Sequence, residues 1–175
     1  MNVQDNTALT SLDLSALTEA GGDLEVYNND ALTSLDLSML TLVGGNLSVS
    51  GNLPSLDLPD LTTAGSLSVS GNAALTSLDL STLTSVEGKL SVSGNAVLTS
   101  FDLPALTSVG GSLWVESNAA LTGFDLPALT SVGGVLWVRL NTYLAQCLVD
   151  ALVAQIQAGL GIFGSCFFYT SPSPR

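Results

Sequence analysis

Six aspartates recur at one position of a repeated segment in this 175-residue chain, with 21 to 23 residues between neighbours. They are Asp13, Asp36, Asp57, Asp79, Asp102 and Asp125. Carboxylate oxygens suit hard cations, so weak Ca²⁺ binding along this acidic stripe is one hypothesis. The favoured interpretation is a solvated face on which nearby Ser and Thr hydroxyls donate hydrogen bonds to the carboxylates. We expect no other cofactor.

Two tryptophans, Trp114 and Trp137, are 23 residues apart and share one position of the repeat. Glu116 and Arg139 share the position two residues later, where a cross-repeat ion pair could form. Exposed aromatic rings beside polar groups are typical of surfaces that bind a glycan or another protein. These four residues are therefore the candidate ligand-binding site.

Packing is the competing interpretation of the tryptophans, and it is the favoured one. In the last repeat Val135, Trp137 and Leu140 replace residues that are mostly polar or Gly in earlier repeats. An outward face that becomes apolar at one end predicts a cover, and the Phe-rich segment 162–169 is the candidate for it.

Three repeats carry serine at both of these outward positions: Ser48 and Ser50, Ser68 and Ser70, and Ser91 and Ser93. Regular hydroxyl arrays on β-solenoids resemble ice-binding surfaces, although those surfaces mostly use Thr. An ordinary strand surface is the favoured interpretation.

The chemistry of enzymes is missing from the sequence. There is no His, the commonest general base and metal ligand, and no Cys-x-x-Cys, G-x-S-x-G or phosphate-binding glycine loop. Fifteen acidic residues against three basic ones give a net charge of -12, which argues against a nucleic-acid partner. No apolar run is long enough to insert into a membrane. We expect a non-enzymatic protein.

A repeat of mostly 23 residues must position all of these side chains, because six units and a partial seventh each open on an asparagine. These are Asn6, Asn29, Asn52, Asn72, Asn95, Asn118 and Asn141. An Asn side chain at a turn can hydrogen-bond the backbone of its own and the next unit, so the column predicts a structural ladder.

Each unit holds two short alternating stretches, such as Leu12-Asp13-Leu14 and Leu24-Glu25-Val26. Alternation with period two predicts strands with one buried face. A Gly-Gly pair separates the stretches in four of the six units, and we expect it to form a turn. The prediction is an all-β solenoid over residues 1–141, in which two strands and two turns form each coil and stacking buries the leucines.

The segment LTSFDLPALTSVGGSLWVESN, residues 98–118, resembles the repeat of the receptor L-domain family, a relative of leucine-rich repeats. The resemblance covers roughly residues 6–147. It implies a right-handed β-helix, a role in ligand binding, and an extracellular or cell-surface setting. It does not imply a particular ligand.

The sequence pattern becomes helical in the C-terminal segment. Apolar residues recur at helical spacing in Leu144, Cys147, Leu148, Ala151, Leu152 and Ile156. They predict a helix of about fourteen residues, ended by Gly159 and Gly161, that caps the open solenoid within a segment spanning 142–169. Cys147 and Cys166 flank this helix and form either a stapling disulfide or two free thiols. Residues 170–175 are expected to be a disordered tail.

The favoured function is a non-catalytic, extracellular binding or adhesion module whose ligand is a protein or glycan. The chain shows no signal peptide, and we expect it to be a fragment. A structural spacer of a larger surface protein is the alternative, and ice binding ranks third. Self-association is also expected, because the first coil has no N-terminal cap and leaves Leu9, Leu12 and Leu14 uncovered.

Overall fold

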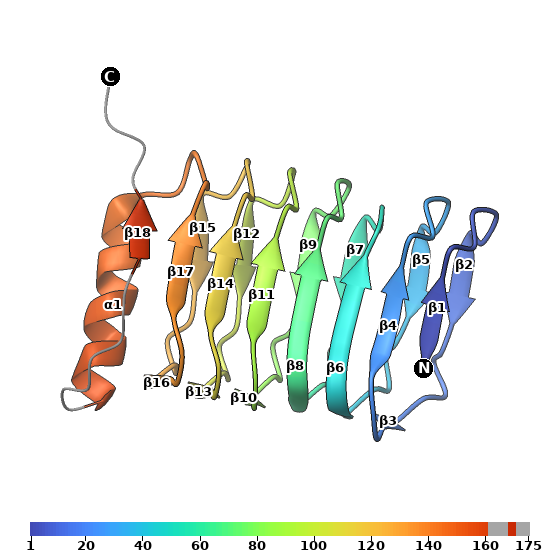
Figure 1. Ribbon diagram of the computed structural model, residues 1–175, viewed down its shortest axis with the longest axis horizontal. Coiled ribbons are helices and arrows are strands. Elements are labelled where there is room, and N and C mark those ends of the chain that lie inside the picture. Colours follow the sequence, from blue (N-terminus) through green and yellow to red (C-terminus); the bar gives the residue numbers. More distant parts are fainter. Residues whose placement is uncertain (161–167, 171–175) are drawn as a thin grey trace.

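The computed structural model describes residues 1–160 and 168–170 and has the predicted architecture, a β-solenoid of about six coils with a C-terminal helix. Parallel strands stack side by side along the long axis, and the helix lies at one end (Figure 1). One long sheet runs the whole length in the order β1 (Asn2–Gln4), β4 (Leu24–Tyr27), β6 (Leu42–Ser50), β8 (Thr63–Ser70), β11 (Leu90–Ser93), β14 (Leu113–Glu116), β17 (Leu136–Arg139) and β18 (Phe168–Thr170). Four two-residue strands extend it, namely β3 (Glu19–Ala20), β10 (Ser85–Val86), β13 (Ser108–Val109) and β16 (Ser131–Val132).

The second side of each coil is a three-residue strand that carries one aspartate. These strands are β2 (Ser11–Asp13), β5 (Ser34–Asp36), β7 (Ser55–Asp57), β9 (Ser77–Asp79), β12 (Ser100–Asp102) and β15 (Gly123–Asp125). They form two separate sheets, β2–β5 and β7–β9–β12–β15, behind the long sheet in Figure 1. The two groups separate at the third unit, which is shorter than the others.

The predicted alternation places leucine and valine inside and polar residues outside. In β4, Leu24 and Val26 are fully buried, whereas Glu25 and Tyr27 are half-buried on the outer face. In-register pairing then places identical residues of successive coils next to each other; Leu90, for example, lies between Leu67 and Leu113. Because every coil repeats these positions, continuous apolar columns fill the interior and the outward columns form regular surfaces.

The Gly-Gly pairs were predicted to form turns, and that prediction is wrong in the second coil. Gly44 and Gly45 lie within β6, where the pairing with β8 shifts register between Val43 and Asn46. A Cβ atom on Gly44 would lie 2.6 Å from the carbonyl oxygen of Gly21 in the preceding coil. Glycine is required here because the backbones of neighbouring coils approach too closely for a side chain.

The helix α1 (Gln146–Leu160) closes the C-terminal end of the solenoid. Its buried face consists of Val149, Leu152 and Ile156, and Gln155 Nε2 donates to the carbonyl oxygens of Leu126 and Leu129 at 2.8 and 2.7 Å. The sequence prediction of that face was partly wrong, because Cys147 and Ala151 are exposed. Two overlapping sets of residues satisfy helical spacing, and contact with the last coil selects the one that contains Val149.

The chain returns to the long sheet after the helix, since β18 pairs in parallel with β17 and matches Phe168 to Trp137 in register. Thr170, predicted to begin a disordered tail, is the last residue of this strand. Within residues 1–160 and 168–170, no helix has the length and apolar character needed to cross a membrane.

Candidate functional site

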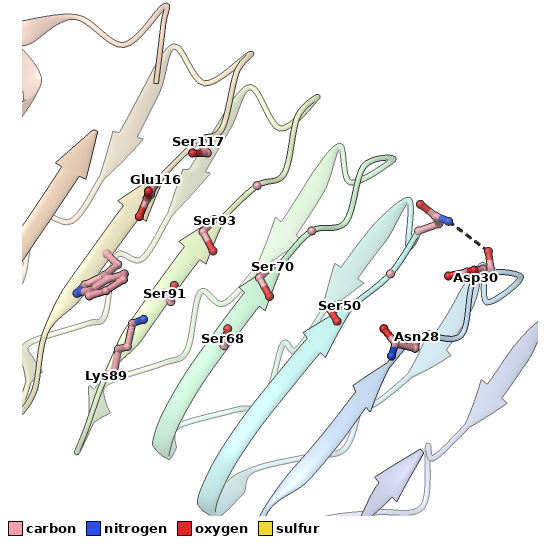
Figure 2. A pocket seen from close by; sticks show the side chains of 15 residues that line it. Asn28, Asp30, Ser50, Ser68, Ser70, Lys89, Ser91, Ser93, Glu116 and Ser117 are labelled. Atoms are coloured by element: carbon pink, nitrogen blue, oxygen red, sulfur yellow. Dashed lines mark hydrogen bonds between the residues drawn. The ribbon is translucent and has the colours of Figure 1, made fainter. Parts of the chain in front are cut away.

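A shallow groove lies on the outer face of the long sheet, and we call it the serine trough. Its volume is about 710 Å³, and it spans the strands β6, β8, β11 and β14 together with the turn after β4. Figure 2 shows hydroxyl groups along its floor. Its lining is Asn28, Asp30, Ser50, Gly51, Asn52, Ser68, Ser70, Gly71, Lys89, Ser91, Ser93, Gly94, Trp114, Glu116 and Ser117.

The depth of the trough follows from side-chain size in the outward columns. Ser50, Ser70 and Ser93 stack in register, and the next residue of this column is Glu116. In the neighbouring column Ser68 and Ser91 are followed by Trp114. Small residues in the middle coils and large ones beyond them leave a hollow whose end wall is Trp114.

The end wall is a stack of aromatic rings and cations. The rings of Trp114 and Trp137 are stacked with centroids 5.7 Å apart and an interplanar angle of 24°. Lys89 Nζ lies 3.4 Å from the centroid of the Trp114 ring, and the Arg139 guanidinium carbon lies 4.5 Å from that of Trp137. Both distances are within the range of cation–π attraction, so each indole contacts a cation and the other indole.

An ion pair completes the wall, because Arg139 Nη2 lies 2.6 Å from Glu116 Oε1. Partial burial lowers the pKa of Lys89 from its ordinary value of 10.5, while the negative charge of Glu116 opposes the shift. Nε1 of Trp114 is buried and has no hydrogen-bond partner among the described residues. The indole nitrogen is therefore not exposed in the trough, and the exposed part of the ring is apolar.

The structure brings together all four predicted binding residues, Trp114, Trp137, Glu116 and Arg139. Both tryptophans are half-buried. The cover predicted from the Phe-rich segment stays a prediction: its residues 162–167 lie outside the described residues, and for Phe168 the structure gives the backbone pairing with Trp137.

Lys89 is the site residue that the sequence analysis missed. It lies two residues before Ser91, in an outward column that otherwise holds Asn46, Ser66 and Ser112 on neighbouring strands. As the sole lysine of the chain it stood out in the composition. The Lys89 side chain extends from its own coil to Trp114 in the next coil, and an alignment of the repeats alone does not reveal such a contact.

The hydroxyls of the trough are not used by the protein. Among the described residues, none of the six lining serines makes a side-chain hydrogen bond to another protein group. The threonines at the corner before β8, β10 and β13 behave differently, since Thr62, Thr84 and Thr107 each donate from Oγ1 to a carbonyl oxygen of the preceding coil at 2.9 to 3.0 Å. Threonine hydroxyls hold the stack together. Ser91 is buried, and the hydroxyls of the other five lining serines remain available to solvent or a ligand.

The asparagine column forms hydrogen bonds between coils. The backbone N–H of Asn95 donates to Oδ1 of Asn118 at 3.0 Å, and Nδ2 of Asn118 donates to the carbonyl oxygen of Val92 at 2.9 Å. The same N–H to Oδ1 bond joins Asn6 to Asn29, Asn72 to Asn95, and Asn118 to Asn141. These side chains satisfy backbone groups at the corner where the chain turns from one coil to the next.

The ladder is interrupted at Asn52. This residue is exposed, and its Nδ2 contacts the carbonyl oxygen of Asp30 at 3.3 Å instead of a buried group. Oδ1 of Asn72, which would accept from Asn52 in an intact ladder, is buried without a partner among the described residues. The shortened third unit changes the path of the turn, and the two N–H to Oδ1 bonds that would join Asn52 to Asn29 and to Asn72 are missing among the described residues.

The acidic stripe lies on the three-residue strands and is remote from the trough. Asp79, Asp102 and Asp125 stack in register, as do Asp13 and Asp36. Asp13 accepts hydrogen bonds from both the hydroxyl and the backbone N–H of Ser15. These bonds lower the pKa of Asp13 below its ordinary value of 3.8, and the hydroxyl has the larger effect. No group of three or more His, Cys, Asp or Glu that could hold a metal occurs among the described residues.

The leucines of the first coil and the two cysteines were also predicted to have roles. Leu9, Leu12 and Leu14 are partly buried against the core, so the first coil is not fully open, and self-association stays a prediction. Cys147 is exposed and unpaired among the described residues. Cys166 lies outside them, so the disulfide also stays a prediction.

Comparisons with known proteins do not assign this chain to a family. No family model matches the chain, and no curated protein or solved structure matches it significantly.

Proposed function

We propose that this protein is a non-catalytic binding module that holds its ligand in the serine trough, at an extracellular or cell-surface location. The observation that supports the proposal is the trough itself, which combines unused hydroxyls with an aromatic end wall. A concave surface with a few converging polar groups is the usual form of a ligand site. The volume of about 710 Å³ lies within the range of roughly 300 to 1,000 Å³ typical of such sites.

Rigidity supports the same proposal. Ser68, Ser70, Ser91 and Ser93 lie on paired strands whose alternate residues are fixed in the apolar core. A ligand therefore meets a preorganised surface, and binding costs little conformational entropy in the protein.

A structural spacer in a larger surface protein is the second candidate. The asparagine and threonine hydrogen bonds between coils favour it, because they stiffen the stack without serving any ligand. This role does not account for the unused serines or for the stacked tryptophans and cations at one end.

Arrays of glycans and of purified extracellular proteins, probed with the labelled chain, test the proposal. The decisive variant is Ser70→Tyr, which fills the middle of the trough; Tyr27 already occupies an equivalent outward site on β4. Ser77→Tyr, at an outward site on β9 behind the trough, is the matched control. We expect a ligand whose signal disappears with Ser70→Tyr and persists with Ser77→Tyr.

Failure to find such a ligand would favour the spacer. A ligand that binds the wild type and both variants equally would also reject the trough as the site. The double variant Trp114→Ala, Trp137→Ala then shows whether the end wall takes part, since its loss should weaken any ligand that contacts the wall.

A further inference from the structure

We infer that the ligand of the serine trough is an uncharged oligosaccharide that lies along the solenoid axis with one end against Trp114. This inference rests on the proposed function and adds the chemical class and orientation of the ligand. Four properties of the trough carry it: the chemistry of the floor, its charge, its length and the nature of its wall.

The floor offers hydroxyl groups and glycine backbone where a protein partner would need apolar anchors. Ser50, Ser70 and Ser93 form one row, Ser68 and Ser91 form the next, and Gly71 and Gly94 border them. The centres of protein–protein interfaces are enriched in aromatic residues, Met and Arg and depleted in Ser. A serine hydroxyl donates one hydrogen bond and accepts two, as a sugar hydroxyl does, so the floor matches a polyhydroxylated ligand.

The charge of the lining excludes acidic sugars. Asp30 and Glu116 are acidic and Lys89 is basic, so the lining carries one net negative charge. The chain as a whole carries -12, which repels a polyanion before contact. Arg139 is already paired with Glu116, and Lys89 lies against an indole ring, so no cluster of cations remains for sulfate, phosphate or carboxylate groups.

The shape favours a chain over a single sugar. The trough extends from the turn after β4 to β14, which is four strand spacings of ~4.8 Å, or roughly 19 Å. Figure 2 shows Ser50, Ser70 and Ser93 in a row that crosses the strands toward Glu116. A hydroxyl row that repeats with every strand gives successive sugar units equivalent partners.

The wall adds an apolar contact and a donor. Trp114 is stacked on Trp137 and has the Lys89 ammonium 3.4 Å from its ring centroid, so a sugar at this end meets the ammonium together with the exposed edge of the indole. The Lys89 ammonium has three N–H groups, and among the described residues it forms no ion pair with a carboxylate. We expect Lys89 to donate to oxygens of the terminal sugar while its charge remains attracted to the indole.

Titrations of the full chain with neutral oligosaccharides test this inference. The probes are β-1,4-linked glucose, xylose and N-acetylglucosamine and β-1,3-linked glucose, from dimer to hexamer, followed by calorimetry and by tryptophan fluorescence. For at least one series we expect affinity to rise with length, a shift in tryptophan emission, and at least a tenfold loss of affinity in Ser70→Tyr. Ser93→Tyr, one strand further along the same row, should give the same loss, and Ser77→Tyr should bind like the wild type.

The outcomes separate the inference from the function on which it rests. A purified protein that binds in a Ser70-dependent manner, with no sugar series binding, overturns the glycan inference and keeps the binding module. Ser70-dependent binding of heparin or polygalacturonate, with no neutral sugar binding, overturns it as well. If no probe and no array ligand depends on Ser70 and Ser93 in variants that keep the wild-type melting temperature, both proposals fail.

Discussion

The backbone N–H of Asn95 donates to Oδ1 of Asn118 across the boundary between two consecutive coils, at a distance of 3.0 Å. Asn118 in turn donates from Nδ2 to the carbonyl oxygen of Val92. Both asparagines are fully buried, so one side chain satisfies two backbone groups that water cannot reach. This relationship makes the asparagine column a test of what holds the coils together.

Replacing Asn118 with Ala should destabilise the protein by about 3 kcal/mol, because it leaves two buried backbone groups without partners. Asn52→Ala is the control, since Asn52 is exposed and outside the ladder. We expect its free energy of unfolding to stay close to that of the wild type. Urea denaturation followed by circular dichroism measures both, and equal losses would contradict a role for the ladder.

Gly44→Ala should cost about 1 to 3 kcal/mol, because the new methyl group meets the carbonyl oxygen of Gly21 and the coils must move apart. Gly21→Ala provides the comparison, since an added Cβ there has no neighbour within 4 Å among the described residues. Thermal melts of the two variants should therefore diverge. A stable Gly44→Ala would show that the coil spacing can adapt.

The acidic stripe predicts different results for two of its members. Asp79 accepts a hydrogen bond from the backbone N–H of Ser81 at 2.9 Å, whereas Pro104 takes the place of that serine after Asp102 and has no N–H to donate. Asp102→Ala removes repulsion from Asp79 and Asp125, up to about 1 kcal/mol each in water. It should raise the melting temperature at low salt, and Asp79→Ala should raise it less.

Salt and calcium test the stripe in the wild type. Added NaCl screens neighbouring carboxylates and should raise the melting temperature, and Ca²⁺ should do so at lower concentration if it binds. The benefit of Asp102→Ala should then shrink as the salt concentration rises. A wild-type melting temperature that is flat in both titrations would reject repulsion and cation binding together.

The contact between Lys89 and Trp114 should be measurable as a coupling energy of about 0.5 to 1 kcal/mol. The double-mutant cycle uses Lys89→Met, which keeps most of the aliphatic stem, and Trp114→Leu. Each single variant loses the cation–π attraction, so the double variant should cost less than the sum of the two. Additive losses would mean that the ammonium contributes no stability where it lies.

Acid titration of Asp13 gives a further test. Hydrogen bonds from Ser15 favour the carboxylate and lower its pKa in the folded protein, so their contribution to stability is complete above the ordinary value of 3.8. That contribution is lost as the pH falls through the lowered pKa. Ser15→Ala removes the hydroxyl donor, and NMR should show the pKa of Asp13 rising toward 3.8.

The repeat made most of the fold predictable. Leucine columns such as Leu67, Leu90 and Leu113 recur at one spacing, and a solenoid is the arrangement that buries them all. The role of Gly44 could not be predicted in the same way, since a turn glycine and one that permits close stacking look alike in sequence. The helix face was ambiguous because Cys147 and Val149 both fit a helical period.

The candidate site was only partly predictable, for a physical reason. Trp114, Trp137, Glu116 and Arg139 follow from the repeat, because in-register stacking brings equal positions together. The trough depends on differences between coils, where small serines lie between larger residues. Lys89 reaches a tryptophan two residues out of register and one strand away, and side-chain packing decides such a contact.

The interruption of the asparagine ladder at Asn52 coincides with a break on one side of the solenoid. The three-residue strands separate at the same place, between β5 and β7, while the long sheet passes through unbroken from β6 to β8. The solenoid thus resembles two blocks joined along one side, and the junction between them depends on the pairing of β6 with β8, which matches seven residue pairs. Gly51, Asn52 and Gly71 at this junction also line the trough, so a ligand that spans it would fasten the two blocks together.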